Sequence, residues 1–419
     1  MPARTRLRYL LALLVVLLAV PAPAATQDLV LTNARVVDVV EGTVLEGRTV
    51  VVADGRIEGI TEGPATGVPS GARVVDVGGM YLAPGLIDGH VHATSADQAR
   101  RALLSGVTTM RSMGADHYAD VGLRELQRAG HLVESPEVLA AGYHVRPPAA
   151  EAFFQDHPEM GRWYGEEIRG EEAIRAMVQA LLSRDVDFIK TNATERAGLP
   201  ETDPRKQFYS REEMAVMVEE ASAQGVGVAA HAHGDEGGRA AVEAGVRSIE
   251  HGTYLGEETL TLMAERGTYL VPTIAIVRDL TIPGGDYDNA VLNIRGRHML
   301  PRILETAAAA HRLGVPIVAA TDTGYGPNST TTLAHELLEL ERVGMSPLEA
   351  LRAATTTAAE LLGVDDHTGH LAPGMEADFI VLERNPLEDI GVVQDVLMVV
   401  SDGRVAVQRG DWFGEPPVS

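Results

Sequence analysis

Histidines recur in this sequence at spacings that suit metal binding. His90 and His92 stand two residues apart at the end of the apolar run Pro84–His92. Side chains at positions i and i+2 of a strand point to the same face, so both imidazoles can reach one ion. A neutral imidazole is the commonest protein ligand for metals. Taken alone, the pair is equally consistent with two hydrogen-bonded or solvated histidines, and the residues downstream decide between these interpretations.

Further polar residues end four later apolar runs. They are Lys190, the pair His231 and His233, His251, and Asp322. A single histidine on an apolar strand is more often a satisfied core residue than a ligand. Asp322 could also cap a helix, since Thr-Asp-Thr can open one. The combination at matching strand ends makes coincidence a poor explanation, and it favours a catalytic metal site.

Lysine is almost absent from the chain. It occurs only at Lys190 and Lys206, and every other basic residue is arginine. A buried lysine amine can lose its proton, whereas a guanidinium cannot. Lys190 lies in the apolar run Val186–Lys190. A lysine at this position, in a chain that otherwise uses arginine, indicates chemistry that needs a primary amine rather than a chance occurrence.

The elements that must position these residues alternate between strand and helix. Eight strands with intervening helices predict an α/β fold, a (β/α)₈ barrel, which places polar site residues at the C-terminal ends of its strands. The predicted strands are Leu86–His92, Thr108–Ser112, Val138–Val145, Val186–Thr191, Val226–His231, Ser248–His251, Tyr269–Ile276 and Pro316–Asp322. The predicted helices include Glu171–Leu182, Arg211–Gln224, Glu236–Ala244, His335–Val343 and Pro347–Leu362.

Short alternating runs at both ends of the chain predict a second, smaller unit. The runs are Leu29–Leu31, Arg35–Val40, Thr49–Ala53, Ile57–Ile60, Val74–Val77, Asp378–Leu382, Val396–Val400 and Arg404–Gln408. We expect one small β-sandwich built from residues 26–82 and 365–419, with the barrel over 83–364. The long segment Arg146–Arg169 interrupts the third repeat, and we expect it to form a lid over the barrel mouth.

Residues 1–25 have the order of a secretory signal. Three arginines precede the apolar run Leu10–Val20, and small residues follow it. The run is too short to span a bilayer, which takes about 20 residues. The signal predicts export to the periplasm or the medium, and we expect no stable membrane span.

Composition excludes some classes of partner. The apolar fraction of 45% and charged fraction of 22% are those of a globular protein. A formal charge of −24 makes nucleic acid and anionic lipid poor partners. There is no cysteine, so neither disulfides nor a lipoprotein anchor are possible.

The motifs together resemble the amidohydrolase superfamily, in its imidazolonepropionase-like and prolidase-like (Xaa-Pro dipeptidase) branch with a carboxylated lysine. They are similar also to ochratoxin-degrading amidohydrolases. The resemblance covers nearly all of the chain after the signal. It rests on Gly85-Leu-Ile-Asp-Gly-His-Val-His92, Asp187-Phe-Ile-Lys190, His231-Ala-His-Gly234, Ser248-Ile-Glu-His-Gly252, Ala320-Thr-Asp322 and Pro373-Gly-Met-Glu-Ala-Asp378.

The resemblance implies a site for two divalent metal ions, with zinc expected for nitrogen and oxygen ligands in a hydrolase. His90, His92 and Asp322 would hold one ion and His231 and His251 the other. Lys190, carboxylated by CO₂, would bridge both. The implied reaction is hydrolysis of an amide or peptide bond by a metal-bridging hydroxide, with Asp322 as general base and acid.

The resemblance also implies contacts with substrate. His233 would lie near the substrate and bind its carboxylate or the tetrahedral oxyanion, since spacing in the family favours His231 as the ligand. Tyr143, His144, Arg146 and Tyr254 are candidate contacts, or solvated loop residues. The chain departs from its relatives in two loops at the barrel mouth, which read Asn192-Ala-Thr-Glu-Arg-Ala-Gly198 and Tyr143-His-Val-Arg-Pro147.

We expect a small carboxylate-bearing substrate: an Xaa-Pro-type dipeptide or an N-acyl amino acid, with ochratoxin as a related compound. A cyclic amidohydrolase or deaminase of the imidazolonepropionase type is a second hypothesis, against which Lys190 argues. A non-catalytic exported binding protein is a third, against which the complete ligand set argues. Homo-oligomers are common among the relatives and are expected here.

Overall fold

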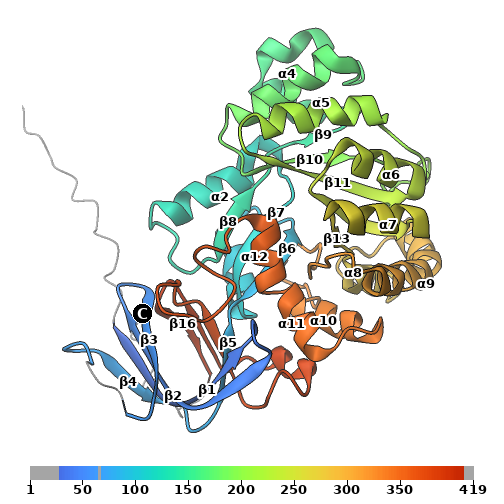
Figure 1. Ribbon diagram of the computed structural model, residues 1–419. Coiled ribbons are helices and arrows are strands. Elements are labelled where there is room, and N and C mark those ends of the chain that lie inside the picture. Colours follow the sequence, from blue (N-terminus) through green and yellow to red (C-terminus); the bar gives the residue numbers. More distant parts are fainter. Residues whose placement is uncertain (1–27, 65–67, 410–419) are drawn as a thin grey trace, which may run out of the picture.

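The computed structural model describes residues 28–64 and 68–409 (Figure 1). The predicted signal over residues 1–25 therefore lies outside the described residues. Among the helices that are described, none is long and apolar enough to cross a membrane.

Strands from the two ends of the chain form one mixed sheet of eight strands, in which the blue and red strands of Figure 1 lie side by side. Its order is β16-β15-β14-β5-β1-β2-β3, with β4 also paired to β1. The strands are β1 (Leu29–Asp38), β2 (Thr43–Ala53), β3 (Arg56–Glu62), β4 (Arg73–Asp76), β5 (Tyr81–Pro84), β14 (Phe379–Leu382), β15 (Met398–Ser401) and β16 (Arg404–Gln408).

Strand β5 joins the two halves of this sheet. It runs antiparallel to β14, with Ala83 opposite Ile380, and parallel to β1, with Leu82 opposite Val36. The sequence predicted that both chain ends would combine, and they do. It did not predict β5, and the two facing layers of a sandwich stay unconfirmed, as do the predicted domain limits.

The middle of the chain contains two parallel sheets with helices between their strands. One has the order β6-β7-β8 and the other β13-β12-β11-β10-β9. Helices α4 to α7 lie along the outer side of the second sheet (Figure 1). The strands are β6 (Leu86–Val91), β7 (Val107–Ser112), β8 (Glu137–Ala140), β9 (His144–Val145), β10 (Phe188–Asn192), β11 (Gly227–Gly234), β12 (Ser248–Tyr254) and β13 (Tyr269–Val271).

The helices match most of the predicted ones within a few residues. They are α1 (Ala96–Leu104), α2 (Ala119–Arg128), α3 (Glu151–Asp156), α4 (Gly170–Leu182), α5 (Arg211–Ser222), α6 (Asp235–Ala244), α7 (Glu257–Arg266), α8 (Ile274–Asp279), α9 (Ala290–Leu313), α10 (Leu333–Arg342), α11 (Pro347–Ala353) and α12 (Thr356–Leu362). Three short 3₁₀ helices are η1 (Asp116–Tyr118), η2 (Pro158–Trp163) and η3 (Ile390–Gln394).

The predicted closed barrel is not formed as one continuous sheet in the described residues, and side chains explain the first gap. The predicted third strand is split into β8 and β9. Between them, the backbone N–H groups of Ala141 and Gly142 donate to the Asp120 carboxylate at 3.1 and 3.0 Å. Because Asp120 replaces a neighbouring strand as acceptor, the ladder stops there.

The second gap is the segment 316–323, which was predicted as the eighth strand. It forms no continuous ladder with β13 or β6, only the isolated bridges Leu270–Ile317 and Val91–Thr323. Two of its amides still bond to these strands, Val318 N to the Leu270 carbonyl at 2.9 Å and Asp322 N to the His90 carbonyl at 2.8 Å. Two others find different acceptors: Thr321 N donates to Asp88 Oδ1 at 3.0 Å, and Ala319 N donates to the Ala353 carbonyl at 2.8 Å.

The helix predicted over Pro347–Leu362 breaks into α11 and α12 for a related reason. The carbonyls of Ala353 and Ala354 leave the helix and accept hydrogen bonds from Ala319 N at 2.8 Å and Ile87 N at 2.7 Å. The break therefore fastens the segment 316–323 and strand β6 to the same turn.

One other prediction needs correction. The strand predicted over Tyr269–Ile276 ends at Val271, because Pro272 lacks an N–H and Thr273 adopts a left-handed φ of 54°, after which α8 begins.

The segment Arg146–Arg169, for which a lid stays a prediction, has secondary structure of its own. It contains α3 and η2, and the Phe153 ring lies 5.5 Å from that of Tyr143.

The buried carboxyl group of Asp378 contributes to the stability of the terminal sheet in a way that depends on pH. Its buried carboxylate accepts hydrogen bonds from Asp402 N at 2.9 Å and Thr368 Oγ1 at 3.1 Å. Burial, together with the nearby Asp402 carboxyl, raises the pKa of Asp378 to about 8. An unfolded aspartate titrates near about 3.9, so the folded protein retains a proton that the unfolded chain releases. This contribution to stability is complete below about pH 4 and is lost as the pH rises through about 8.

The substitution Asp378→Asn mimics the protonated form and should remove this loss. Between about pH 5 and pH 9 the parent should lose on the order of 1–3 kcal/mol relative to the variant, as measured by urea unfolding. Glu58→Gln, at an exposed position of β3, removes the same charge and serves as the control. Parallel pH profiles for parent and Asp378→Asn would contradict the assignment.

Candidate metal centre

The first cluster forms where β6 meets the segment 316–323. The Asp322 backbone N–H donates to the His90 carbonyl at 2.8 Å, which sets the two residues side by side. Asp322 Oδ1 then lies 3.3 Å from His90 Nε2 and 3.1 Å from His92 Nε2. Asp322 has a left-handed φ of 54°, an unfavourable conformation for a non-glycine residue and one that is typical of functional sites.

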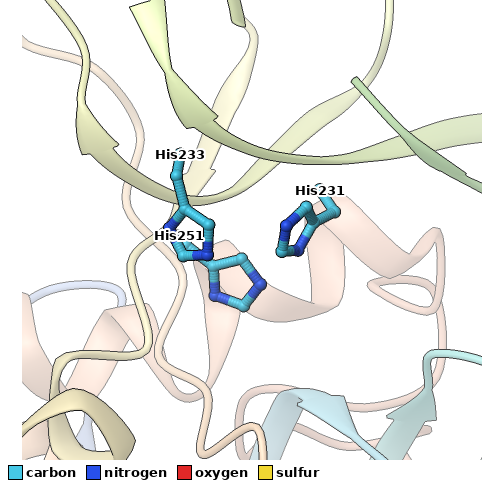
Figure 2. A group of neighbouring side chains, drawn as sticks. All are labelled: His231, His233 and His251. Atoms are coloured by element: carbon cyan, nitrogen blue, oxygen red, sulfur yellow. The ribbon is translucent and has the colours of Figure 1, made fainter. Parts of the chain in front are cut away.

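The second cluster comes from the ends of β11 and β12 (Figure 2). The ring centroids of His231, His233 and His251 are 4.7 to 4.9 Å apart. Each residue offers a nitrogen within 4.8 Å of the others. His233 was predicted to contact substrate while His231 held the metal, and the geometry brings both into the same group.

His251 points into this group because its strand departs from regular geometry. Glu250 and His251 are consecutive and would face opposite ways in an ideal strand. His251 has a φ of 71°, and the register with β11 shifts after Ala232. Both side chains therefore point toward the site.

Lys190 on β10 lines the same cavity as both clusters. Its side chain is 1% exposed, and Nζ has no hydrogen-bond partner within the described part of the chain. The Nε2 atom of His231 is likewise buried without a partner. Burial lowers the pKa of the Lys190 amine to about 8. Buried polar atoms are nearly always satisfied, so this pair indicates a group that the protein side chains do not supply.

The two clusters face one another across a short gap. The rings of His90 and His251 are 5.3 Å apart, and His251 Nδ1 lies 3.9 Å from Asp322 Oδ2. Burial would raise the pKa of Asp322, but the charges and hydrogen bonds of His90 and His92 outweigh it and hold that pKa well below the usual range. Burial also lowers the pKa of His251 and of His231 well below normal, so both imidazoles are neutral and able to bind a metal.

Buried polar groups behind the clusters fix the rings. Glu250 Oε2 lies 2.7 Å from His90 Nδ1, and its other oxygen accepts from Arg111 at 3.0 Å and from Ser248 Oγ at 2.5 Å. Because Glu250 engages Nδ1 of His90, the other ring nitrogen, Nε2, points toward Asp322. A carboxylate behind a histidine orients it and raises its basicity as a ligand.

Threonine hydroxyl groups fix the orientation of two imidazole rings in the second cluster. His233 Nδ1 shares a hydrogen bond with Thr253 Oγ1 and His251 Nδ1 one with Thr273 Oγ1, both at 2.8 Å. The Nε2 atoms are thereby left to face the cavity.

All six predicted metal ligands line one cavity of about 440 Å³. This size suits a small organic substrate. The cavity is also lined by the predicted substrate contacts Tyr143, His144, Arg146 and His233. Tyr254 is absent from the described lining, and its ring lies 6.0 Å from that of His298. The predicted role of Tyr254 gains no support from its position.

Two of the predicted substrate contacts, Tyr143 and His144, already have hydrogen-bond partners within the protein. The Tyr143 hydroxyl donates to Asp156 at 2.6 Å and accepts from His117 N at 2.7 Å, so its polar end is occupied. His144 Nδ1 lies 3.1 Å from Asn192 Oδ1, which leaves its Nε2 free.

The sequence did not single out several residues of the site. Glu250 and Arg111 read as ordinary strand residues, since their ion pair joins strands far apart in the chain. Arg196 and Tyr287 lie in the cavity wall, and the Tyr287 hydroxyl donates to the Asp322 carbonyl at 3.1 Å. Of these residues, only Arg196 could have been noticed in the sequence, because it lies in a loop that departs from related sequences.

The donor set fits two divalent ions. Neutral imidazoles with carboxylate oxygen are the ligands of hydrolytic zinc and related metals. The cluster of His90, His92 and Asp322 and the cluster of His231, His233 and His251 each offer three such atoms.

Comparison with known proteins agrees with this geometry. The model of the amidohydrolase family matches residues 81–406. The chain is 31% identical to ochratoxinase of Aspergillus niger over 350 residues, covering 75% of this chain and 72% of that protein. It is 30% identical to imidazolonepropionase of Paracoccus denitrificans over 389 residues, covering 82% and 90%.

A solved structure of a Xaa-Pro dipeptidase with methionine bound in its active site superposes with a TM-score of 0.79 at 26% identity, over 90% of this chain and 99% of that one. The family match spans most of the chain, and the buried histidines and Asp322 supply the ligands that a metal-dependent family requires. The chain therefore belongs to the amidohydrolase family and is a hydrolase of carbon–nitrogen bonds.

Proposed function

We propose that the protein is a binuclear metal-dependent amidohydrolase that cleaves an amide or peptide bond in a small carboxylate-bearing substrate. The observation that carries this proposal is the buried Nζ of Lys190, which has no partner among the described residues, in a cavity that it shares with two clusters of candidate metal ligands. A site for one ion would not need an amine in that place.

In this proposal His90, His92 and Asp322 would hold one ion and His231 and His251 the other. Lys190, carboxylated by CO₂, would supply an anionic bridge between the two ions. The neutral amine attacks CO₂, an N–C bond forms and one proton leaves, which converts a buried amine into an anionic group with two oxygens. Two such ions, zinc by preference, would polarise the substrate carbonyl and lower the pKa of a water molecule.

The side chains of this protein supply the remaining functions. Asp322 would take the proton of the attacking water through its carboxylate and give it to the leaving nitrogen. His233, next to His231 and His251, would stabilise the oxyanion that develops on the carbonyl or bind the substrate carboxylate. His144 and Arg146 line the same cavity and would bind the substrate carboxylate.

The relatives support this choice of substrate. One is named for ochratoxin, and a structural neighbour is a Xaa-Pro dipeptidase. We therefore propose an Xaa-Pro-type dipeptide, an N-acyl amino acid or an ochratoxin-like amide as the substrate class.

Metal removal tests the proposal directly. Exhaustive dialysis against a chelator should abolish hydrolysis of a dipeptide and N-acyl amino acid panel, and zinc should restore it. Elemental analysis should find two ions per chain. Unchanged activity after complete metal removal would refute the proposal, and a single tightly bound ion would favour the cyclic amidohydrolase or deaminase hypothesis.

Lys190→Ala should lower the metal content and reduce kcat by roughly 10³-fold or more, because it removes the bridging oxygens. A short carboxylic acid such as acetate should partly restore activity, since it can occupy the space of the carbamate. Lys206→Ala, which removes the other lysine, should keep its metal content and show no rescue. Lys190→Ala with full metal content would exclude the carbamate.

Glu250→Gln should weaken metal binding by roughly 10- to 100-fold, because Glu250 orients His90. Metal titration measures the loss, with Glu265→Gln on the exposed face of α7 as the control. The melting temperature of the metal-free variant separates this effect from a folding defect. Metal affinity equal to the parent would show that Glu250 serves only to pair Arg111.

We also propose that residues 1–25 direct export and that the mature protein forms homo-oligomers. The charge and apolar order of the segment supports export. N-terminal sequencing of the secreted or periplasmic protein tests cleavage, and light scattering tests the oligomer.

If the protein binds two metal ions but hydrolyses no member of the substrate panel, the hypothesis of a non-catalytic binding protein is favoured.

A further inference from the structure

Two guanidinium groups in the cavity wall have no partner. Arg146 follows β9 and Arg196 follows β10, and both line the cavity with the metal ligands. Within the described residues, neither side chain makes a hydrogen bond or an ion pair. Arg111, Arg278 and Arg295 are by contrast all held by carboxylates or carbonyls. In a chain with a formal charge of −24, two free cations at one site are a marked local excess.

The loop that carries Arg196 is anchored on both sides of it. Lys206 Nζ binds Glu195 Oε1 at 2.7 Å, and Glu195 Oε2 accepts from Asp203 N at 2.8 Å. On the other side, Arg295 of α9 donates to the Ala197 carbonyl at 2.6 Å. The backbone at Arg196 is therefore fixed while its side chain stays free, an arrangement that preorganises a binding group.

The nearby charges do not neutralise the pair. Asp116 lines the same cavity but lies beyond ion-pair distance from both arginines, and Asp322 is engaged by His90 and His92. Burial lowers the pKa of Arg146 and the charge of Arg196 lowers it further, and the charges of Asp116 and Tyr209 offset this only in part. The two cations thus repel each other, and an anion between them would remove this cost.

One guanidinium is enough to bind one carboxylate through two parallel hydrogen bonds. Two guanidiniums on adjacent loops match two anionic groups. We propose that Arg146 and Arg196 together select a dicarboxylic leaving group, so that the enzyme prefers a peptide or N-acyl compound that ends in glutamate or aspartate. Arg146 takes one carboxylate and Arg196 the other. This inference rests on the proposed amide hydrolysis and adds the substrate class.

The test compares isosteric pairs that differ only in charge: N-acetyl-Glu with N-acetyl-Gln, and Ala-Glu with Ala-Gln. The zinc-loaded parent should show a kcat/KM roughly 10- to 100-fold higher for the acidic member of each pair, the size of one charge-assisted contact. Arg196→Gln should remove this preference, mainly by raising the KM of the acidic member of each pair. Arg312→Gln, at an exposed position of α9, should behave as the parent.

Binding of the free amino acids gives a readout apart from catalysis. Calorimetry should detect glutamate binding to the parent, weaker binding of glutamine, and equal weak binding of both to Arg196→Gln. Equal kcat/KM within each pair, a preference that survives Arg196→Gln, or a preference for the acidic group in the acyl half would each overturn the inference. If no substrate is cleaved at all, the proposed function fails, and calorimetry alone decides whether the two-arginine site exists.

Discussion

The backbone register between β10, β11 and β12 is the constraint on which the site depends. Parallel pairing places Asn192 opposite His231 and His231 opposite Glu250, and Lys190 lies two residues before Asn192 on the same face. Since the side-chain period of a strand is two, a slip of one residue would turn each of these groups away from the cavity. Backbone hydrogen bonds therefore bring Lys190, His231 and Glu250 to the cavity, and side-chain hydrogen bonds then fix the rings of His233 and His251.

The sequence predicted which residues would line one cavity better than it predicted the path of the chain. Spacing alone assigned His90, His92, Lys190, His231 and Asp322 to the ends of apolar strands, because polar residues at strand ends leave a regular pattern. The breaks could not be predicted, since each depends on a distant acceptor. Asp120 takes the amides between β8 and β9, and the Ala353 carbonyl takes an amide of the predicted eighth strand.

Contacts between distant strands set a similar limit on the site. The hydrogen bond of Glu250 to His90 joins residues 160 positions apart, and the ion pair to Arg111 joins residues 139 apart. Neither leaves a local pattern. Strand β5 was missed for another reason: it is four residues long, ends at Pro84, and is recognisable as a strand only because β1 and β14 flank it.

The hairpin that bears Arg196 shows how this architecture can diversify. Its base is closed by a bridge between Thr194 and Gln207, and Arg295 of α9 holds its side, so its backbone does not rely on the side chain at position 196. None of these contacts involves a histidine of the two clusters or Asp322. Evolution can therefore exchange residue 196, and with it the chemistry of the cavity wall, while the two clusters stay intact.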